Sequence, residues 1–273
     1  SCPPSSGYQR VAAQASPMRV TAPRQRPAAP LVVDGLAPES SVVYLFRRSP
    51  ATKACQGCGK MHEDMASGTG LVAAHDSSGT IVLTNSHFVR DAPLQSQLSD
   101  ASDNNGLASR PLVGGQIYVK PTVQNPEQAV LKSKIPAYLI SEDTAADCVV
   151  LYVPPHPEFS PAVAYLWPSW DNTLRTETKL WMWGYPEDSK RIVGATSRYK
   201  GEWAGFSWMN RPPKSGESGS PVMAQWKDGH LFVVGMISGR SPDTGDGKTG
   251  MIVPASKMES LLVDTAARES VLA

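Results

Sequence analysis

The 273-residue sequence lacks the features by which several classes of protein are recognised. It has no apolar run of about 18 residues or more, so we expect no helix that spans a bilayer. It also has little net charge: 26 Lys and Arg against 25 Asp and Glu give +1, which does not indicate binding to nucleic acid or to a membrane surface. Four cysteines are too few for a disulfide scaffold in a chain of this size.

What the sequence does contain is a series of short β-rich runs separated by Gly, Asp, Asn and Pro. The first clear run is 41–46 and a later one is 116–120. This succession favours an all-β barrel or sandwich over an α/β fold. Residues 1–37 are instead rich in Pro, Ala, Ser and Gln. We interpret them as a flexible tail or tether, because such a composition buries too little apolar surface to offset the cost of ordering.

The pattern becomes helical near the C-terminus. Ser256 and Glu259 have the spacing of a capping box, and Met258, Leu261 and Leu262 share one helical face. We therefore predict a closing helix that packs on the second half of the β structure.

One Gly/Ser stretch, 214–222, has the composition of a turn that presents a nucleophile. Ser218 lies between Gly216, which lets the backbone approach a substrate carbonyl, and Gly219, which tolerates backbone angles closed to other residues. The N–H groups of Gly216 and Ser218 are then predicted to form an oxyanion hole. The same composition is also typical of an ordinary turn between strands.

A serine hydroxyl needs a base and an orienting carboxylate to become a nucleophile, and the sequence offers candidates for both. His87 ends an apolar strand that starts near Thr80, and Asp147 stands at the mouth of another apolar strand, 148–153. Glu142 and Asp143 compete with Asp147 for the role of the acid. The remaining histidines, His62, His75, His156 and His230, lie in loops and turns. The chain order His, Asp, Ser differs from that of subtilisin-like enzymes and of α/β-hydrolases.

Five segments, in this order, resemble motifs of chymotrypsin-fold serine proteases, and most closely the protease domain of HtrA/DegP-type enzymes. The first two are Ser-Gly-Thr-Gly-Leu-Val at 67–72 and the strand and histidine at 81–87. The others are Asp-Cys-Val-Val-Leu at 147–151, the stretch ending in Gly-Tyr-Pro at 179–186, and Gly-Met-Ile-Val-Pro at 250–254. Together they cover roughly residues 42–262.

The resemblance implies two antiparallel six-stranded β-barrels and a C-terminal helix within a protease domain at 38–273, with the barrels meeting near 155–175. It also implies that His87 and Asp147 come from the first barrel and Ser218 from the second. The expected reaction is hydrolysis of a polypeptide substrate through an acyl-enzyme, without a cofactor or a metal. No PDZ segment is expected after Leu262, and an extracytoplasmic, secreted or virion-associated protein is favoured. The alternative is a structural or virion-type scaffold protein with this fold, inactive or active only in self-cleavage.

In this fold the specificity pocket would be lined by two short segments: Pro213, Lys214, Ser215 and Ile237, Ser238, Gly239. Trypsins have an aspartate six residues before the nucleophile, where this chain has Pro212, so basic substrate residues should be poor because their charge would be unpaired. Small or medium apolar residues are expected, although Lys214 and Arg240 leave an acidic preference open. Glu217 replaces the aspartate that in trypsins pairs with a new N-terminus. The activation-like run 191–194 follows both His87 and Asp147, so we interpret it as a strand start.

The cysteines divide into two groups with different expected roles. Cys148 is most simply a small core residue. Cys55, Cys58 and His62 have the spacing of a zinc knuckle, but a fourth ligand is missing, so we favour a local disulfide or free thiols and keep structural zinc as the alternative. In either case the role would be structural, with no metal in the chemistry.

Overall fold

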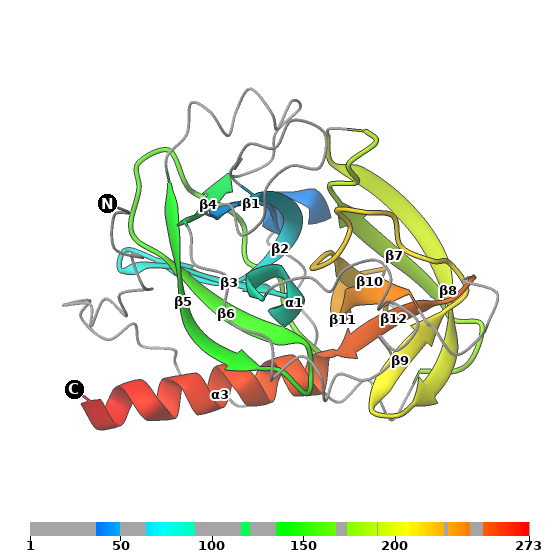
Figure 1. Ribbon diagram of the computed structural model, residues 1–273. Helices are drawn as coiled ribbons and strands as arrows, with labels where there is room; N and C mark the ends of the chain where they lie inside the picture. Colours follow the sequence, from blue (N-terminus) through cyan, green and yellow to red (C-terminus); the bar gives the residue numbers. More distant parts are fainter. Residues whose placement is uncertain are drawn as a thin grey trace.

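Two closed barrels of six antiparallel strands make up the computed structural model (Figure 1). The structure describes residues 37–49, 64–90, 116–120, 135–167, 174–189, 191–226, 229–240 and 248–272. The predicted tail, apart from Ala37, and the group Cys55, Cys58 and His62 lie outside the described residues.

The first barrel follows a short 3-10 turn, η1 (Pro38–Ser41). Its strands close in the order β1-β2-β3-β6-β5-β4. They are β1 (Val42–Ser49), β2 (Asp64–Asp76), β3 (Gly79–Thr84), β4 (Gln116–Lys120), β5 (Pro136–Asp143) and β6 (Cys148–Val153). β2 and β3 form a hairpin in which the Asp76 carboxylate accepts hydrogen bonds from the N–H and hydroxyl of Ser78, and these bonds lower the pKa of Asp76.

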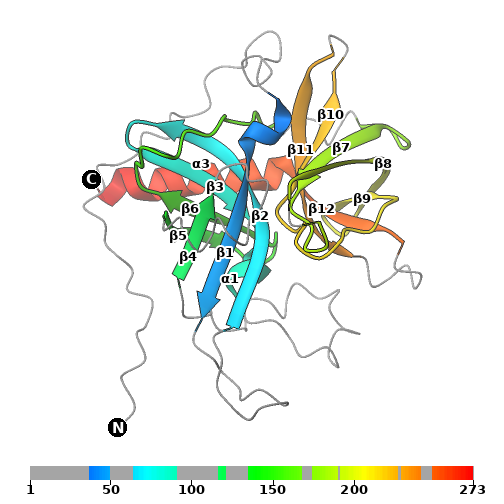
Figure 2. The ribbon, with the colours of Figure 1, turned by 90° about the horizontal axis from the view of Figure 1, so that it is seen from above.

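The second barrel closes in the order β10-β11-β12-β9-β8-β7. Its strands are β7 (Lys179–Gly184), β8 (Val193–Trp203), β9 (Phe206–Met209), β10 (Pro221–Gln225), β11 (Leu231–Arg240) and β12 (Gly250–Pro254). β8 begins at Val193, which agrees with the interpretation of 191–194 as a strand start. The ring formed by β7–β12 is seen end-on in Figure 2.

Each barrel has its own apolar interior, and a further core lies between the barrels. β3 contributes to two of these cores, because all of its residues are buried. Val82 packs in the interior of the first barrel, whereas the next residue, Leu83, belongs to a core cluster that also contains Met236 and Val253 of the second barrel. Successive strand residues point to opposite faces, so a strand between two cores must be apolar on both. The predicted all-β class is confirmed, and the architecture is consistent with a chymotrypsin-like fold.

The predicted C-terminal helix is present as α3 (Ala255–Leu272). It begins between the barrels and runs along the first (Figures 1 and 2), contacting β5 and β6 as well as β11 and β12. Met258 and Leu261 are buried in the core between the barrels. The helix thus packs on both barrels rather than on the second alone. The helix begins one residue before Ser256, so Ser256 lies in its first turn.

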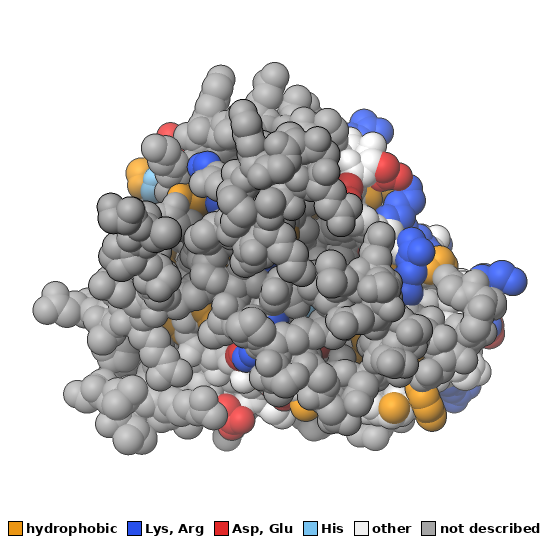
Figure 3. Space-filling view, in the orientation of Figure 1, with side chains coloured by type: hydrophobic (Ala, Val, Ile, Leu, Met, Phe, Trp, Pro, Cys, Tyr) orange, Lys and Arg blue, Asp and Glu red, His pale blue; other side chains and the backbone are white. Residues whose placement is uncertain are grey.

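The described surface carries charges of both signs. Figure 3 shows Lys and Arg side chains next to Asp and Glu side chains over the second barrel, on the right of the view. Exposed ion pairs such as Lys200–Glu177 and Lys214–Asp188 account for part of this mixture. None of the described helices is long and apolar enough to cross a membrane.

Candidate active site

His87 and Asp147 are in direct contact, although 60 residues separate them in the sequence. The Nδ1 atom of His87 lies 2.9 Å and 3.1 Å from the two carboxylate oxygens of Asp147. The backbone N–H of His87 donates to the same carboxylate at 3.0 Å. The His87 side chain is 39% exposed and that of Asp147 only 3%, so a buried carboxylate orients an imidazole that solvent can reach.

The position of His87 differs from the expectation of a strand end. β3 stops at Thr84, and His87 lies on the one-turn helix α1 (Ser86–Val89) that follows. The turn brings the backbone N–H of His87 to face Asp147, which a continued strand paired with β6 would not do. Short helical turns of this kind carry no hydrophobic period of their own, so the sequence pattern did not reveal it.

Asp147 has a left-handed backbone, with φ of 53°, in the turn before β6. Aspartate is among the few residues with a side chain that tolerate this conformation. Its backbone carbonyl accepts from the Asn85 side chain at 3.1 Å, and its carboxylate accepts from the Ser238 hydroxyl. Asp147 is therefore fixed at its backbone and at its carboxylate.

The two competing carboxylates have other partners. Glu142 accepts two hydrogen bonds from the guanidinium of Arg90, at 2.6 Å and 2.5 Å, and one from the Ser86 hydroxyl. These bonds to Glu142 raise the pKa of Arg90. Asp143 accepts the backbone N–H of Ala146 at 3.0 Å. Glu142 and Asp143 thus brace α1 and the 144–147 turn, while Asp147 contacts the imidazole.

Ser218 lies on the loop between β9 and β10, in a closely packed turn. Gly216 and Gly219 both have φ of 85°, where L side chains are strained. A Cβ atom on Gly219 would lie 1.8 Å from the carbonyl oxygen of Thr69, and one on Gly216 would lie 2.4 Å from that of Tyr185. Both glycines are therefore required by the backbone path around Ser218.

Ser238 connects Ser218 to the His87–Asp147 pair. The Ser218 hydroxyl donates to the backbone carbonyl of Ser238 at 3.2 Å, and the Ser238 hydroxyl donates to Asp147. Ser238 is buried on β11, so the second barrel supplies a donor to the acid of the first. We had expected Ser238 only as a pocket residue, and no sequence signal pointed to its contact with Asp147.

Two backbone N–H groups of the Ser218 turn are unoccupied. The carbonyl of Ser215 accepts from the N–H of Glu187, and the carbonyl of Glu217 accepts from the N–H of Ser220. In a planar trans peptide the N–H points opposite to the carbonyl, so the N–H groups of Gly216 and Ser218 face away from those partners. Within the part of the chain that the structure describes, neither donates to an acceptor. Two free donors beside a serine hydroxyl are suited to binding an anionic oxygen.

Thr69 of the first barrel holds this turn in place. Its N–H donates to the carbonyl of Ser218 at 2.9 Å, and its hydroxyl donates to the carbonyl of Gly216 at 2.9 Å. The hydroxyl also accepts from the N–H of Tyr185, at 3.0 Å. Thr69 is fully buried on β2. In the sequence Thr69 stands out only as part of the 67–72 motif, which does not indicate this role.

The predicted pocket residues lie on two tied segments: Pro213, Lys214, Ser215 before the serine and Ile237, Ser238, Gly239 on β11. The Arg240 side chain donates to the carbonyl of Pro213 at 3.1 Å, which joins the segments. The side chain of Ile237 packs inside the second barrel. A Cβ on Gly239 would meet nothing within 4 Å, so space is open there.

The remaining cysteine and histidine predictions that fall on described residues concern Cys148 and three histidines. Cys148 is a free, buried thiol in the core between the barrels, and burial raises its pKa. His75 shares a hydrogen bond of 2.8 Å with Thr80, the ring of His156 accepts from the N–H of Glu158, and the carbonyl of His230 accepts from the N–H of Trp226. Within the described ranges, no three His, Cys, Asp or Glu residues are grouped so as to hold a metal.

Comparison with protein-family models and with curated protein sequences finds no match to this chain. The case for a function therefore depends on the fold and on the geometry of the residues around Ser218.

Proposed function

We propose that the protein is a serine endopeptidase with a chymotrypsin-like fold, in which Ser218, His87 and Asp147 form the catalytic triad. The observation that carries this proposal is the buried Asp147 carboxylate, which binds Nδ1 of a partly exposed His87 and is linked through Ser238 to Ser218. An ion pair that only stabilised the fold would not require a solvent-exposed imidazole. It would also not require a serine linked to the same aspartate through Ser238. The HtrA-like segments of the sequence support the same reaction.

The mechanism follows from these positions. The Ser218 hydroxyl oxygen attacks the carbonyl carbon of the scissile peptide, and Nε2 of His87 takes the hydroxyl proton. Asp147 holds the proton on Nδ1 and stabilises the imidazolium that forms. The N–H groups of Gly216 and Ser218 bind the oxyanion. His87 then protonates the leaving amine, and a water molecule, deprotonated by His87, cleaves the acyl-enzyme.

Labelling with a fluorophosphonate probe tests the proposal, because only a serine aligned with a base reacts quickly. The wild-type protein should form one adduct, located at Ser218 by peptide mapping. Ser218→Ala should abolish labelling and lower peptidase activity by several orders of magnitude, with little change in thermal stability. Adding His87→Ala to Ser218→Ala should have little further effect, because the residues act as one unit.

Absence of labelling in a folded wild-type protein would contradict the proposal and favour the alternative. In that alternative the protein is a scaffold of the protease fold, inactive or active only in self-cleavage. Retention of most peptidase activity by Ser218→Ala would instead show that Ser218 is not the nucleophile.

A further inference from the structure

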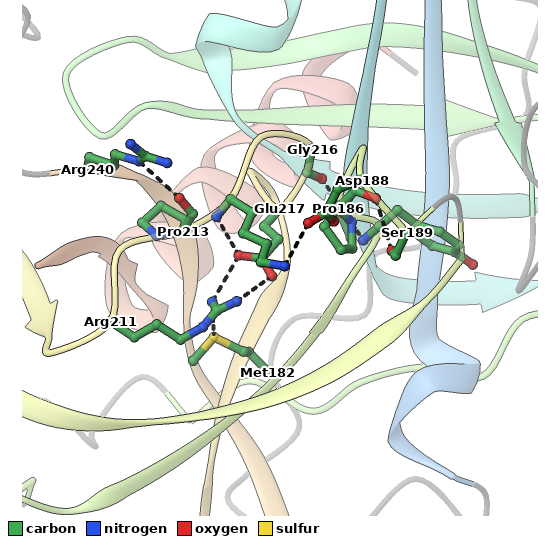
Figure 4. A network of polar contacts seen from close by, with 12 residues as sticks. Met182, Pro186, Asp188, Ser189, Arg211, Pro213, Gly216, Glu217 and Arg240 are labelled. Atoms are coloured by element: carbon green, nitrogen blue, oxygen red, sulfur yellow. Dashed lines mark hydrogen bonds and ion pairs between the residues drawn. The ribbon is translucent and has the colours of Figure 1, made fainter. Parts of the chain in front are cut away.

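A buried carboxylate stands directly before the candidate nucleophile, and it belongs to Glu217. Its side chain is 3% exposed, and it accepts hydrogen bonds from both terminal nitrogens of Arg211, at 2.9 Å and 2.7 Å. The backbone N–H of Lys214 donates to it as well, at 2.7 Å. Figure 4 shows the Arg211 guanidinium meeting this carboxylate end-on above Met182.

These contacts determine the shape of the turn that presents the two free N–H groups. The N–H of Glu217 donates to the carbonyl of Lys214, while the N–H of Lys214 donates to the Glu217 side chain, so the two residues close the turn reciprocally. The peptide bond between Ser215 and Gly216 lies inside this closed turn. Its carbonyl accepts from the N–H of Glu187, so the direction of the Gly216 N–H is set by that hydrogen bond together with the turn that the Glu217 carboxylate closes.

The Glu217 carboxylate can stay buried because the Arg211 guanidinium pairs with it. An unpaired buried charge is strongly unfavourable, so without Arg211 the turn would be expected to rearrange until Glu217 met solvent. A guanidinium matches a carboxylate with two parallel hydrogen bonds, which an ammonium group does not. Met182 also helps to position Arg211, because its sulfur lies 3.4 Å from a terminal nitrogen of the guanidinium.

We propose that Arg211 is a positioning residue that holds the Ser218 turn in its anion-binding form through Glu217. The inference rests on the proposed function. The cation belongs to the same segment, six residues before Glu217, so the oxyanion hole is assembled on folding and needs no new N-terminus from chain cleavage. The run 191–194 follows both His87 and Asp147 and starts a strand, so it does not supply a new N-terminus, and Arg211 provides the cation for Glu217 instead.

Kinetics of the Arg211→Ala variant test the proposal. The rate of fluorophosphonate labelling and kcat should each fall about 100-fold, the size of effect seen when one oxyanion donor is lost, while KM changes much less. Arg211→Lys should restore part of the rate. Guanidinium ions at millimolar concentration should also restore part of the rate of Arg211→Ala, because the site of the missing side chain is partly open to solvent. Arg198→Ala, which removes an exposed arginine of β8, is the matched control and should change the rate less than about twofold.

Amide hydrogen exchange gives a readout that does not require activity. Exchange across 212–220 should be faster in Arg211→Ala than in the wild type or in Arg198→Ala. If Arg211→Ala does not fold, Arg211→Met combined with Glu217→Gln removes both charges, and we expect this variant to fold and to be labelled at least ten times more slowly than wild type. Wild-type labelling and exchange in the Arg211 variants would overturn the inference. A wild type that is not labelled would overturn the proposed function instead, while the exchange data would still decide the role of Arg211.

Discussion

The two barrels have the same connectivity but contribute to the site in different ways. Read around each ring, β1-β2-β3-β6-β5-β4 and β7-β8-β9-β12-β11-β10 have the same strand order. The connection after the third strand carries a site residue in both: His87 follows β3, and Ser218 precedes β10. The first barrel places its residues in short turns at strand ends, whereas the second uses the longer 210–220 loop.

The two barrels differ in the contacts that support their site residues. In the first barrel most of the supporting contacts are local to that barrel, as in Asn85 to Asp147 and Arg90 to Glu142, and Ser238 adds one hydrogen bond from the second barrel. The Ser218 loop is held partly by its own Arg211–Glu217 pair and partly by Thr69 from the other barrel. The Ser218 loop depends on contacts across the interface, so its geometry should be more sensitive to substitutions at residues other than His87, Asp147 and Ser218.

The largest effect is expected from Asp147→Asn, which tests the first barrel's contribution. Asparagine tolerates the left-handed backbone at this position, so the fold should survive, but an amide stabilises the wrong imidazole tautomer. We expect kcat to fall by about 10⁴-fold with little change in thermal stability. Steady-state kinetics and a melting curve measure both. Glu142→Gln is the comparison, and an equal loss of kcat there would contradict the assignment of Asp147 as the acid.

An intermediate effect is expected from Thr69→Val, which tests whether the first barrel positions the nucleophile. Valine keeps the volume but leaves the carbonyl of Gly216 and the N–H of Tyr185 without the hydroxyl between them. Each orphaned buried group costs about 1–3 kcal/mol, so the free energy of unfolding should fall by that order and labelling of Ser218 should slow by roughly 10- to 100-fold. Thr69→Ser, which keeps the hydroxyl, should stay near wild type. Equal behaviour of the two variants would show that only packing matters at Thr69.

The smallest effect is expected from Lys214→Ala, which tests specificity at the edge of the second barrel. Lys214 is exposed and already pairs with Asp188, so its removal should change the rate of cleavage after apolar residues by less than about threefold. A peptide library should show cleavage mainly after small or medium apolar residues in both proteins. Dominant cleavage after Arg or Lys would overturn this view of the pocket, and an acidic preference that disappears in Lys214→Ala would assign Lys214 to it.

The sequence by itself determined the strands and the order of the site residues. Short β-rich runs separated by Gly, Asp, Asn and Pro predicted β strands, because those residues end strands by their own backbone preferences. The glycines around Ser218 predicted a strained turn, because their freedom is a property of the residue. The same local logic failed at His87, where one helical turn has no period to detect.

Only the tertiary structure decided which groups meet. Three contacts join segments that the sequence leaves independent: that of His87 with Asp147 rather than Glu142, that of Ser238 with Asp147, and that of Thr69 with the Ser218 turn. A fourth, the pairing of Arg211 with Glu217, lies within one loop, but no sequence pattern pairs the two residues. Three of these four contacts join residues more than 50 positions apart, and no local pattern encodes such a contact. Burial increases the contribution of each contact to stability, because a polar or charged group removed from water must find its partner within the fold.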